Sequence, residues 1–185
     1  MREAVIVDAI RTARGKRKGT FAATHPMDLV SHLLQAMAKR NPKLPVEKVD
    51  DVILGCVTPV GEQGFNIARG AVLAAGYPIE VPGTTINRFC GSGQQAVHFA
   101  AQAIMAGEMD ICLAGGVEHM TRVPMGSDGL GGDGPLSKAM LDRWPNLVPQ
   151  GLSAEMVAEK WGFNRTQVDT FALESQKRAA NAIEK

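Results

Sequence analysis

Residues 83–116, GTTINRFCGSGQQAVHFAAQAIMAGEMDICLAGG, decide the fold of this chain. The stretch opens with the β-prone run GTTINRF, and after a glycine-rich turn at Cys90 its apolar residues recur at helical spacing as far as Gly107. A second apolar run, DICLAGG, ends the stretch at Gly116. A strand, a helix and a strand joined by short links predict two parallel strands with a right-handed crossover.

The residues before this stretch show the same alternation. AVIVDAI (4–10) and DDVILGCVTPV (50–60) are continuous apolar runs of the kind that buried parallel strands have. Helical spacing covers residues 26–40, with proline at the first position, and residues 66–76, with an asparagine cap. We therefore expect an α/β fold with a largely parallel sheet in a first domain, residues 1–120.

After residue 120 the pattern changes. Residues 121–151 are rich in Gly, Pro and Met and have no clear period, which is typical of a long excursion. Helices are expected at residues 153–162 and from residue 165 onward, where Asn164 and Gln167 form a capping-box pattern. The last helical pattern continues to Lys185 without a stop signal, so we expect residues 121–185 to be a partial helical domain of a truncated chain.

The overall charge excludes some classes of partner. The chain of 185 residues has 20 Lys and Arg against 19 Asp and Glu, a formal net charge of +1. This balance predicts neither nucleic-acid nor membrane binding, and we interpret the basic run at residues 11–19 as a solvated loop. No signal peptide and no apolar stretch of about 18 residues is present, so we expect a cytoplasmic protein.

Three cysteines, at positions 56, 90 and 112, are odd in number and widely spaced, which predicts neither a disulfide framework nor a zinc site. Cys56 and Cys112 lie within apolar strands and are interpreted as packing residues. We expect no bound metal ion.

Cys90 lies at the junction between a strand and a helix. A helix N-terminus has unpaired N–H groups and a partial positive charge, and such positions lower the pKa of a thiol from about 8.5 to between roughly 3.5 and 7.5. Gly91 and Gly93 fit a sharp turn that leaves room for a ligand at the sulfur. Spacing alone leaves two interpretations open, a nucleophile or a small core residue, and Ser92 is a rival nucleophile that would need a partnered base.

Several segments of the chain, in one order, resemble the N-terminal part of the thiolases, the acetyl-CoA acyltransferases. The resemblance covers essentially residues 5–185. The segments that carry it are IVDAIRTARGKRKGTF (6–21), GEQGFNIARGAVLAAG (61–76), NRFCGSGQQA (87–96), LAGGVEHMT (113–121) and GLSAEMVAEKWGFNRTQVDTFALESQKRAANA (151–182).

The resemblance implies an acyl-cysteine mechanism. Cys90 would attack the thioester of an acyl-CoA, and its backbone N–H would help to hold the developing oxyanion. The reaction would be the thiolytic cleavage of a 3-ketoacyl-CoA or the reverse Claisen condensation, with coenzyme A as a substrate and no permanently bound cofactor. A complete enzyme would be a homodimer or homotetramer.

The resemblance also implies a thiolase-like fold, in which this chain is the first βαβα half, with a mixed, largely parallel sheet, plus the beginning of a helical loop domain. The Gly-His-Pro histidine and the Cys-x-Gly cysteine of the family do not occur, so the chain alone should not turn over. Glu118 and His119 would support the site or an interface rather than act as acid or base. Gln150 replaces a residue that lies near the acyl group in many members, which implies bulkier or more polar acyl chains.

Two alternatives stay open from the sequence. The chain could be a non-catalytic folded module, or a half-enzyme that needs a second chain. A ketoacyl-synthase-like condensing enzyme would share the fold and the cysteine, but the segments RTARGK, FNIARG and GGVEHM favour a thiolase. Unpaired sheet edges and an uncovered apolar face predict self-association.

Overall fold

The computed structural model describes residues 2–132 and 134–185. The chain forms two compact units, Met1–Pro135 and Leu136–Lys185. Residues just after 120 are bound into the first unit, because Val123 is 4% exposed and Thr121 Oγ1 accepts a hydrogen bond from Lys18 N at 3.2 Å. A domain boundary at 120/121 stays a prediction.

The first unit contains a parallel sheet. Its strands are β1 (Asp51–Gly55), β2 (Gly83–Ile86) and β3 (Cys112–Gly116), in the order β2-β1-β3. Both pairings are parallel, with Ile53 opposite Thr84 on one side and Ala114 on the other. Parallel pairing is therefore confirmed. No antiparallel strand joins this sheet within residues 2–132 and 134–185, so its mixed character stays a prediction.

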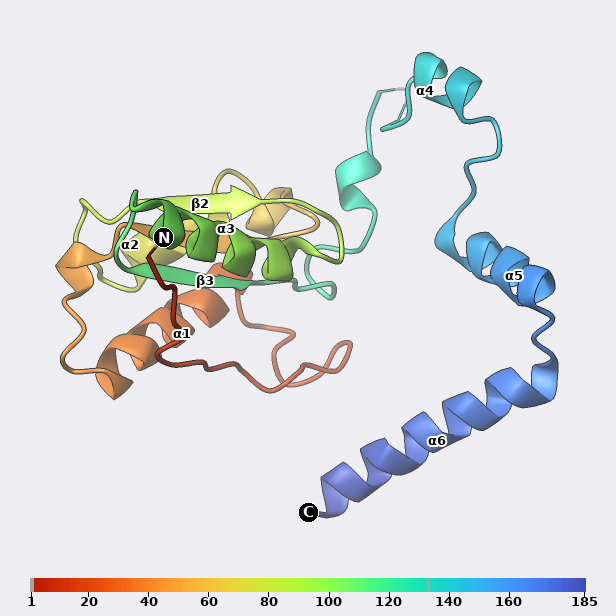
Figure 1. The fold of residues 1–185 in the computed structure, drawn as a ribbon, viewed down its shortest axis with the longest axis horizontal. Coiled ribbons are helices and arrows are strands. Elements are labelled where there is room, and N and C mark those ends of the chain that lie inside the picture. The colour runs from red at the N-terminus through yellow and green to blue at the C-terminus, as the bar shows by residue number, and fades with distance from the viewer. Residues whose placement is uncertain (1, 133) are drawn as a thin grey trace. The chain divides into compact units, whose positions relative to one another are not determined.

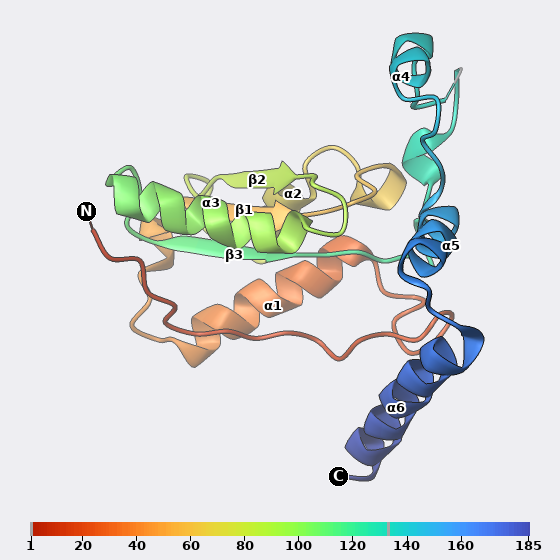
Figure 2. The same cartoon turned by 45° about the vertical axis from the view of Figure 1, so that its right-hand side comes forward.

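Helices cover both faces of this sheet (Figures 1 and 2). Helix α3 (Ser92–Ala106) lies on one face, and α1 (Pro26–Arg40) and α2 (Ile67–Ala74) lie on the other. The predicted helices in these three regions are thus confirmed. The short 3-10 turns η1 (Val46–Lys48), η2 (Gly61–Gln63) and η3 (Ser127–Gly129) lie in the connections.

Strand β1 supplies the core on both sides of the sheet because successive side chains point to opposite faces. Val52 and Leu54 pack with α1 and α2, whereas Ile53 packs with Ala96 and Ala100 of α3. All five residues of β1 are buried. Burial of each such aliphatic side chain stabilises the fold by about 1.5–3 kcal/mol.

The apolar run at residues 4–10 is not a strand, contrary to the sequence-based expectation. Val5, Ile6 and Val7 are 66%, 80% and 85% exposed, and the segment is extended without a ladder to any described strand. Polar side chains in and beside the segment attach it to the rest of the unit instead. Arg2 pairs with Asp110, and Asp8 accepts hydrogen bonds from Arg40 and Asn41, each at 2.8 Å. An apolar sequence favours a strand, but only a neighbouring strand can supply the ladder.

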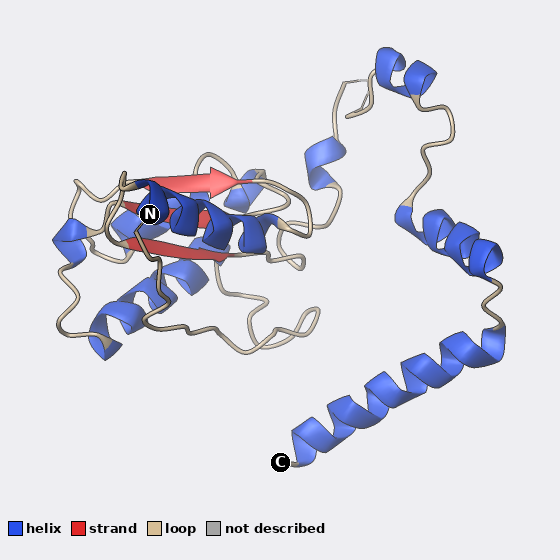
Figure 3. Ribbon diagram, in the orientation of Figure 1, coloured by secondary structure: helices blue, strands red, loops and turns tan. Residues whose placement is uncertain are grey.

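The second unit is helical (Figure 3). It contains α4 (Lys138–Arg143), α5 (Gln150–Trp161) and α6 (Arg165–Glu184). The capping box at the start of α6 is confirmed, with the Asn164 side chain accepting from Gln167 N at 3.0 Å and Gln167 Oε1 accepting from Asn164 N at 2.9 Å. Over the described part of the chain, no helix combines the length and the apolar character that a membrane crossing requires.

Candidate active site

A shallow cavity of about 230 Å³ opens at the carboxyl ends of the parallel strands. In open α/β sheets, this end is where ligands bind. Residues at the end of each of the three strands or soon after it line the cavity: Gly55, Val57, Phe89, Cys90, Ser92, Gly93, Gly116, Val117 and Glu118. Topology thus brings Cys90 and Glu118, which are distant in the sequence, to one hollow.

Cys90 is the exposed thiol of the chain and lies in the turn between β2 and α3. Strand β2 ends at Ile86, Gly91 caps α3, and the helix begins at Ser92. The predicted strand, turn and helix around Cys90 are therefore present. The cysteine is not part of the core, so the core-residue interpretation is wrong.

The sharp turn at Cys90 does not depend on Gly91 and Gly93, as the sequence suggested, but on Phe89 and Gly55. Gly91 has a φ of −90°, which any residue adopts, and Phe89 has the left-handed φ of 46°. A Cβ atom on Gly93 would lie 3.9 Å from its nearest neighbour, whereas a Cβ atom on Gly55 would lie 2.4 Å from the Ser92 carbonyl carbon. The position that requires glycine is therefore Gly55, at the end of β1, because the start of α3 packs directly against it.

The Ser92 hydroxyl hydrogen-bonds with the backbone of the turn. Its side chain is 3% exposed, its Oγ donates to Phe89 O at 2.6 Å, and it accepts from Arg88 N at 2.8 Å. Both partners are backbone groups, and neither is a base that could remove the serine proton. These contacts argue against Ser92 as the nucleophile.

Glu118 joins the ends of two strands beside the cavity. Its Oε2 accepts from Val57 N at 2.7 Å and its Oε1 accepts from Gln63 Nε2 at 2.9 Å. Gln63 is fully buried and also accepts from His119 N at 2.6 Å. The carboxylate and the amide together fasten the loop after β1 to the segment after β3.

The other two thiols are protected. Cys56 is 1% exposed, and burial, with a smaller effect of the Glu118 charge, raises the pKa of its thiol to about 11. Cys112 is half-buried against the α3 side of the core, and burial with the nearby Asp50 and Asp51 raises its thiol pKa to about 11. Both are packing residues, as the sequence predicts, and both stay protonated at neutral pH.

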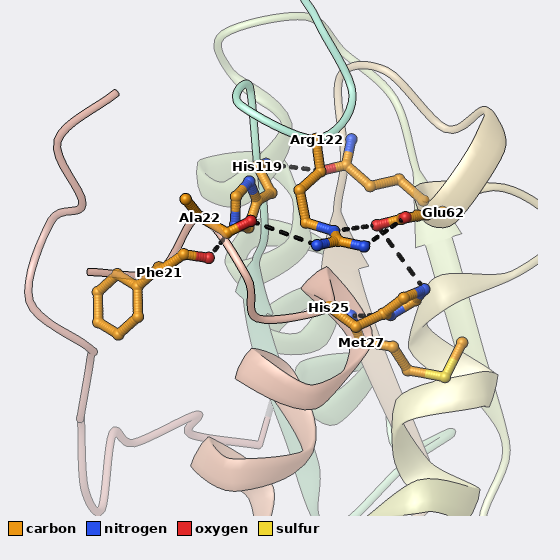
Figure 4. A network of polar contacts seen from close by, with 8 residues as sticks. Phe21, Ala22, His25, Met27, Glu62, His119 and Arg122 are labelled. Carbon is orange, nitrogen blue, oxygen red and sulfur yellow. Dashed lines mark hydrogen bonds and ion pairs between the residues drawn. The ribbon is translucent and has the colours of Figure 1, made fainter. Parts of the chain in front are cut away.

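A polar network supports the segment that follows Glu118 (Figure 4). Arg122 pairs with the Glu62 carboxylate, whose Oε1 it approaches to 2.7 Å, and hydrogen bonding from this guanidinium is the main cause that lowers the pKa of Glu62. His25 Nε2 lies 4.0 Å from the same carboxylate. His119 Nε2 hydrogen-bonds with the Phe21 carbonyl at 2.8 Å. The network fastens residues 21–25 and η2 to the chain after β3.

Gln150 lies in the first turn of α5 in the second unit and is exposed. Its predicted role in substrate binding stays a prediction. A cavity of about 710 Å³ in this unit is lined by Asn146, Leu147, Val148, Ser153, Met156, Val157, Glu159, Lys160 and Trp161. Among the residues that the structure describes, no three His, Cys, Asp or Glu side chains gather as metal ligands would.

A family model described as "Thiolase, N-terminal domain" matches residues 4–185. The chain belongs to the thiolase family. It is 45% identical to a 3-ketoacyl-CoA thiolase of Aliivibrio fischeri, covering 98% of this chain and 46% of that protein. It is 46% identical to a 3-ketoacyl-CoA thiolase of Erwinia tasmaniensis, with 100% and 47% covered. A steroid 3-ketoacyl-CoA thiolase of Mycobacterium tuberculosis is 44% identical, with 99% and 47% covered.

The chain thus spans about half the length of the curated relatives it matches. Sequence reasoning assigned no role to two polar residues of this thiolase domain, Asn87 and Gln63. Asn87 stands in the segment NRFCGSGQQA that carries the resemblance, and Gln63 follows Glu62 in GEQGFN. A polar residue three positions before a candidate nucleophile was the available signal for Asn87, but one of its two partners, Val57, lies 30 positions away in the loop after β1.

Proposed function

We propose that this chain carries the nucleophile of a CoA-dependent acyltransferase of the thiolase family, and that Cys90 accepts the acyl group. The reaction of the complete protein is the thiolytic cleavage of a 3-ketoacyl-CoA or the reverse Claisen condensation. Relatives named 3-ketoacyl-CoA thiolases support this substrate class.

The observation that carries the proposal is the contrast among the three thiols. Cys90 is exposed in a cavity at the start of a helix of 15 residues, whereas Cys56 is buried and Cys112 is half-buried. A helix N-terminus favours negative charge, which develops on a thiolate and on the carbonyl oxygen it attacks.

The proposed first step conserves atoms and charge. With an acyl-CoA as the donor, the Cys90 thiolate adds to the thioester carbonyl, the tetrahedral intermediate collapses, and CoA leaves as a thiolate that takes up the proton released from Cys90. With a 3-ketoacyl-CoA, the thiolate adds to the 3-keto carbon, the C2–C3 bond breaks, and acetyl-CoA leaves as an enolate that takes up that proton. The attacking and leaving sulfurs have similar basicity, so the acyl-cysteine is neither a deep trap nor a high barrier. The Cys90 N–H is the donor that we assign to the developing oxyanion.

The remaining parts of the proposal concern the complete protein. A histidine and a second cysteine outside this chain activate the nucleophile and transfer the proton, so this chain alone does not turn over. Coenzyme A acts as a substrate and not as a bound cofactor. The complete enzyme is a cytoplasmic homodimer or homotetramer of fatty acid metabolism, and Gln150 contacts the acyl chain.

The experiment is acylation of the chain by acetyl-CoA or a 3-ketoacyl-CoA, measured by intact mass and peptide mapping. We expect one acyl group per chain, on Cys90, without continued release of CoA. The variant Cys90→Ser should take up none. The matched controls Cys56→Ser and Cys112→Ser should be acylated as the wild type is, because the pKa of both thiols is raised to about 11 and neither is ionised at neutral pH.

A chain that takes up no acyl group at Cys90, although Cys90 reacts with iodoacetamide, would contradict the proposal for this chain. The interpretation as a non-catalytic module, or as a half-enzyme that needs a second chain, would then replace it. Acylation at Cys56 or Cys112 instead would contradict the assignment of the nucleophile.

A further inference from the structure

The peptide between Phe89 and Cys90 is held by Ser92. The Phe89 carbonyl oxygen accepts from Ser92 N at 3.0 Å and from Ser92 Oγ at 2.6 Å. A trans peptide is planar, and its C=O and N–H groups point in opposite directions. Two donors on the Phe89 oxygen therefore also fix the direction of the Cys90 N–H, the group to which we assign the oxyanion.

The other side of Phe89 is held by Asn87. Asn87 Oδ1 accepts from Phe89 N at 2.9 Å. Phe89 has a φ of 46°, a left-handed conformation that is unfavourable for a residue with a side chain. The Phe89 side chain is 73% exposed, so core packing does not compensate this cost. Hydrogen bonds at both its N–H and its C=O keep the strained residue in place.

Asn87 also connects this turn to the other two strands. Its Nδ2 donates to Val57 O at 2.9 Å, and Val57 N in turn donates to Glu118 Oε2 at 2.7 Å. Val57 follows β1 and Glu118 follows β3, so one chain of contacts crosses the carboxyl end of the sheet. Val57 and Glu118 line the cavity together with Cys90.

We propose that Asn87 and Ser92 are positioning residues that lock the Phe89–Cys90 peptide, so that the Cys90 thiol and its N–H act together on one thioester. The Asn87 side chain fixes the direction of the Phe89 N–H by accepting its hydrogen bond, and Ser92 fixes the direction of the Phe89 carbonyl by donating to it. The mechanistic meaning of this lock rests on the proposed acyl transfer to Cys90, but the lock itself is a property of the turn.

The experiment compares two reactions of the same sulfur in Asn87→Ala and Ser92→Ala. Alkylation by iodoacetamide needs only an accessible thiolate, whereas acylation by acetyl-CoA also needs an oriented oxyanion donor. A misplacement of about 1 Å costs on the order of 100-fold in rate. We expect each variant to lose about 10- to 100-fold in acylation, and less than about threefold in alkylation across the same pH range.

Gln95→Ala is the matched control. Gln95 lies one turn further along α3 and accepts from Arg88 Nη1 at 2.6 Å, so it contacts the same turn without holding the Phe89–Cys90 peptide. We expect its acylation and alkylation rates to match those of the wild type. Thermal melting of all three variants checks that the fold is kept.

A parallel loss of both reactions would show general disorder at the turn and overturn the proposal, as would wild-type acylation in both variants. Amide hydrogen exchange of chain labelled with ¹⁵N-phenylalanine and ¹⁵N-cysteine gives a readout that needs no acyl transfer. We expect the Phe89 amide to exchange at least about tenfold faster in Asn87→Ala, because its acceptor is lost. If the wild type takes up no acyl group, the proposed function fails, and an unchanged Phe89 amide overturns the positioning role separately.

Discussion

Gly55 is the residue at which the sheet and the helix that follows Cys90 come closest. A Cβ atom there would lie 2.4 Å from Ser92 C and 2.5 Å from Gly93 N, both of them backbone atoms that cannot rotate away. Because Gly55 has no side chain, α3 can begin directly beside the end of β1. This contact between β1 and the start of α3 therefore positions the turn at Cys90.

We expect Gly55→Ala to destabilise the first unit by about 1–3 kcal/mol, because the added methyl group must push α3 away from β1. Gly93→Ala is the matched control in the same contact region. Its added Cβ atom would lie 3.9 Å from the nearest atom, and alanine is favoured over glycine in a helix by about 0.5–1 kcal/mol. Urea denaturation of both variants measures the effects, and equal stabilities would contradict the packing argument.

Among the elements of the first unit, α2 and β2 are joined by the side chain of Asn66 and by the Thr85 hydroxyl, which accepts from Ala68 N at 3.1 Å. Asn66 caps α2, with its Oδ1 accepting from Arg69 N at 3.2 Å and from Thr85 Oγ1 at 2.7 Å. Its Nδ2 donates to Gly83 O at 2.7 Å. The cap thus also aligns the edge strand β2, whose end leads into the turn at Cys90.

We expect Asn66→Ala to lower the free energy of unfolding of the first unit by about 2–4 kcal/mol, since it removes both a cap and the contacts to β2. Asn164→Ala removes the comparable cap of α6 in the second unit, where it should cost about 1 kcal/mol. Hydrogen exchange, read by mass spectrometry on peptides from α2, β2 and α6, measures both. Faster exchange in α2 and β2 caused by Asn164→Ala would contradict this division of effects.

At the scale of the whole molecule, much apolar surface is uncovered. The strands β2 and β3 are the edges of the sheet, and large apolar side chains such as Ile6, Val7 and Phe65 are more than 75% exposed. Unpaired edges and apolar patches of this kind bind further chains.

We therefore expect the isolated chain to self-associate at micromolar concentration, with the apparent mass rising with concentration. Size-exclusion chromatography with light scattering measures it. Ile6→Lys places a charge on the exposed extended segment and should weaken association if that segment takes part. A monomer at every concentration would contradict the expectation.

The helices at residues 26–40, 92–106 and 165–184 could be predicted because each depends on neighbours in the sequence, whereas α4 (Lys138–Arg143) lies within residues 121–151, where we expected a long excursion without a clear period. The helix over residues 92–106 follows from apolar spacing and ends at Gly107, and the capping box of α6 needs only Asn164 and Gln167. Residues 4–10 were wrongly predicted as a strand, because a ladder needs a partner that apolar character cannot supply.

From the residues alone one could predict the α/β class, the parallel strands, the strand–turn–helix around Cys90 and the thiolase family. These follow from periodicity and from several motifs in one order. The folded chain was needed to show that Gly55 must be glycine, that Ser92 holds the backbone of the turn, and that hydrogen bonds join Asn87, Val57 and Glu118. Those contacts link residues 30 and 61 positions apart, and only the parallel pairing of β1 with both neighbours brings their carboxyl ends to one place.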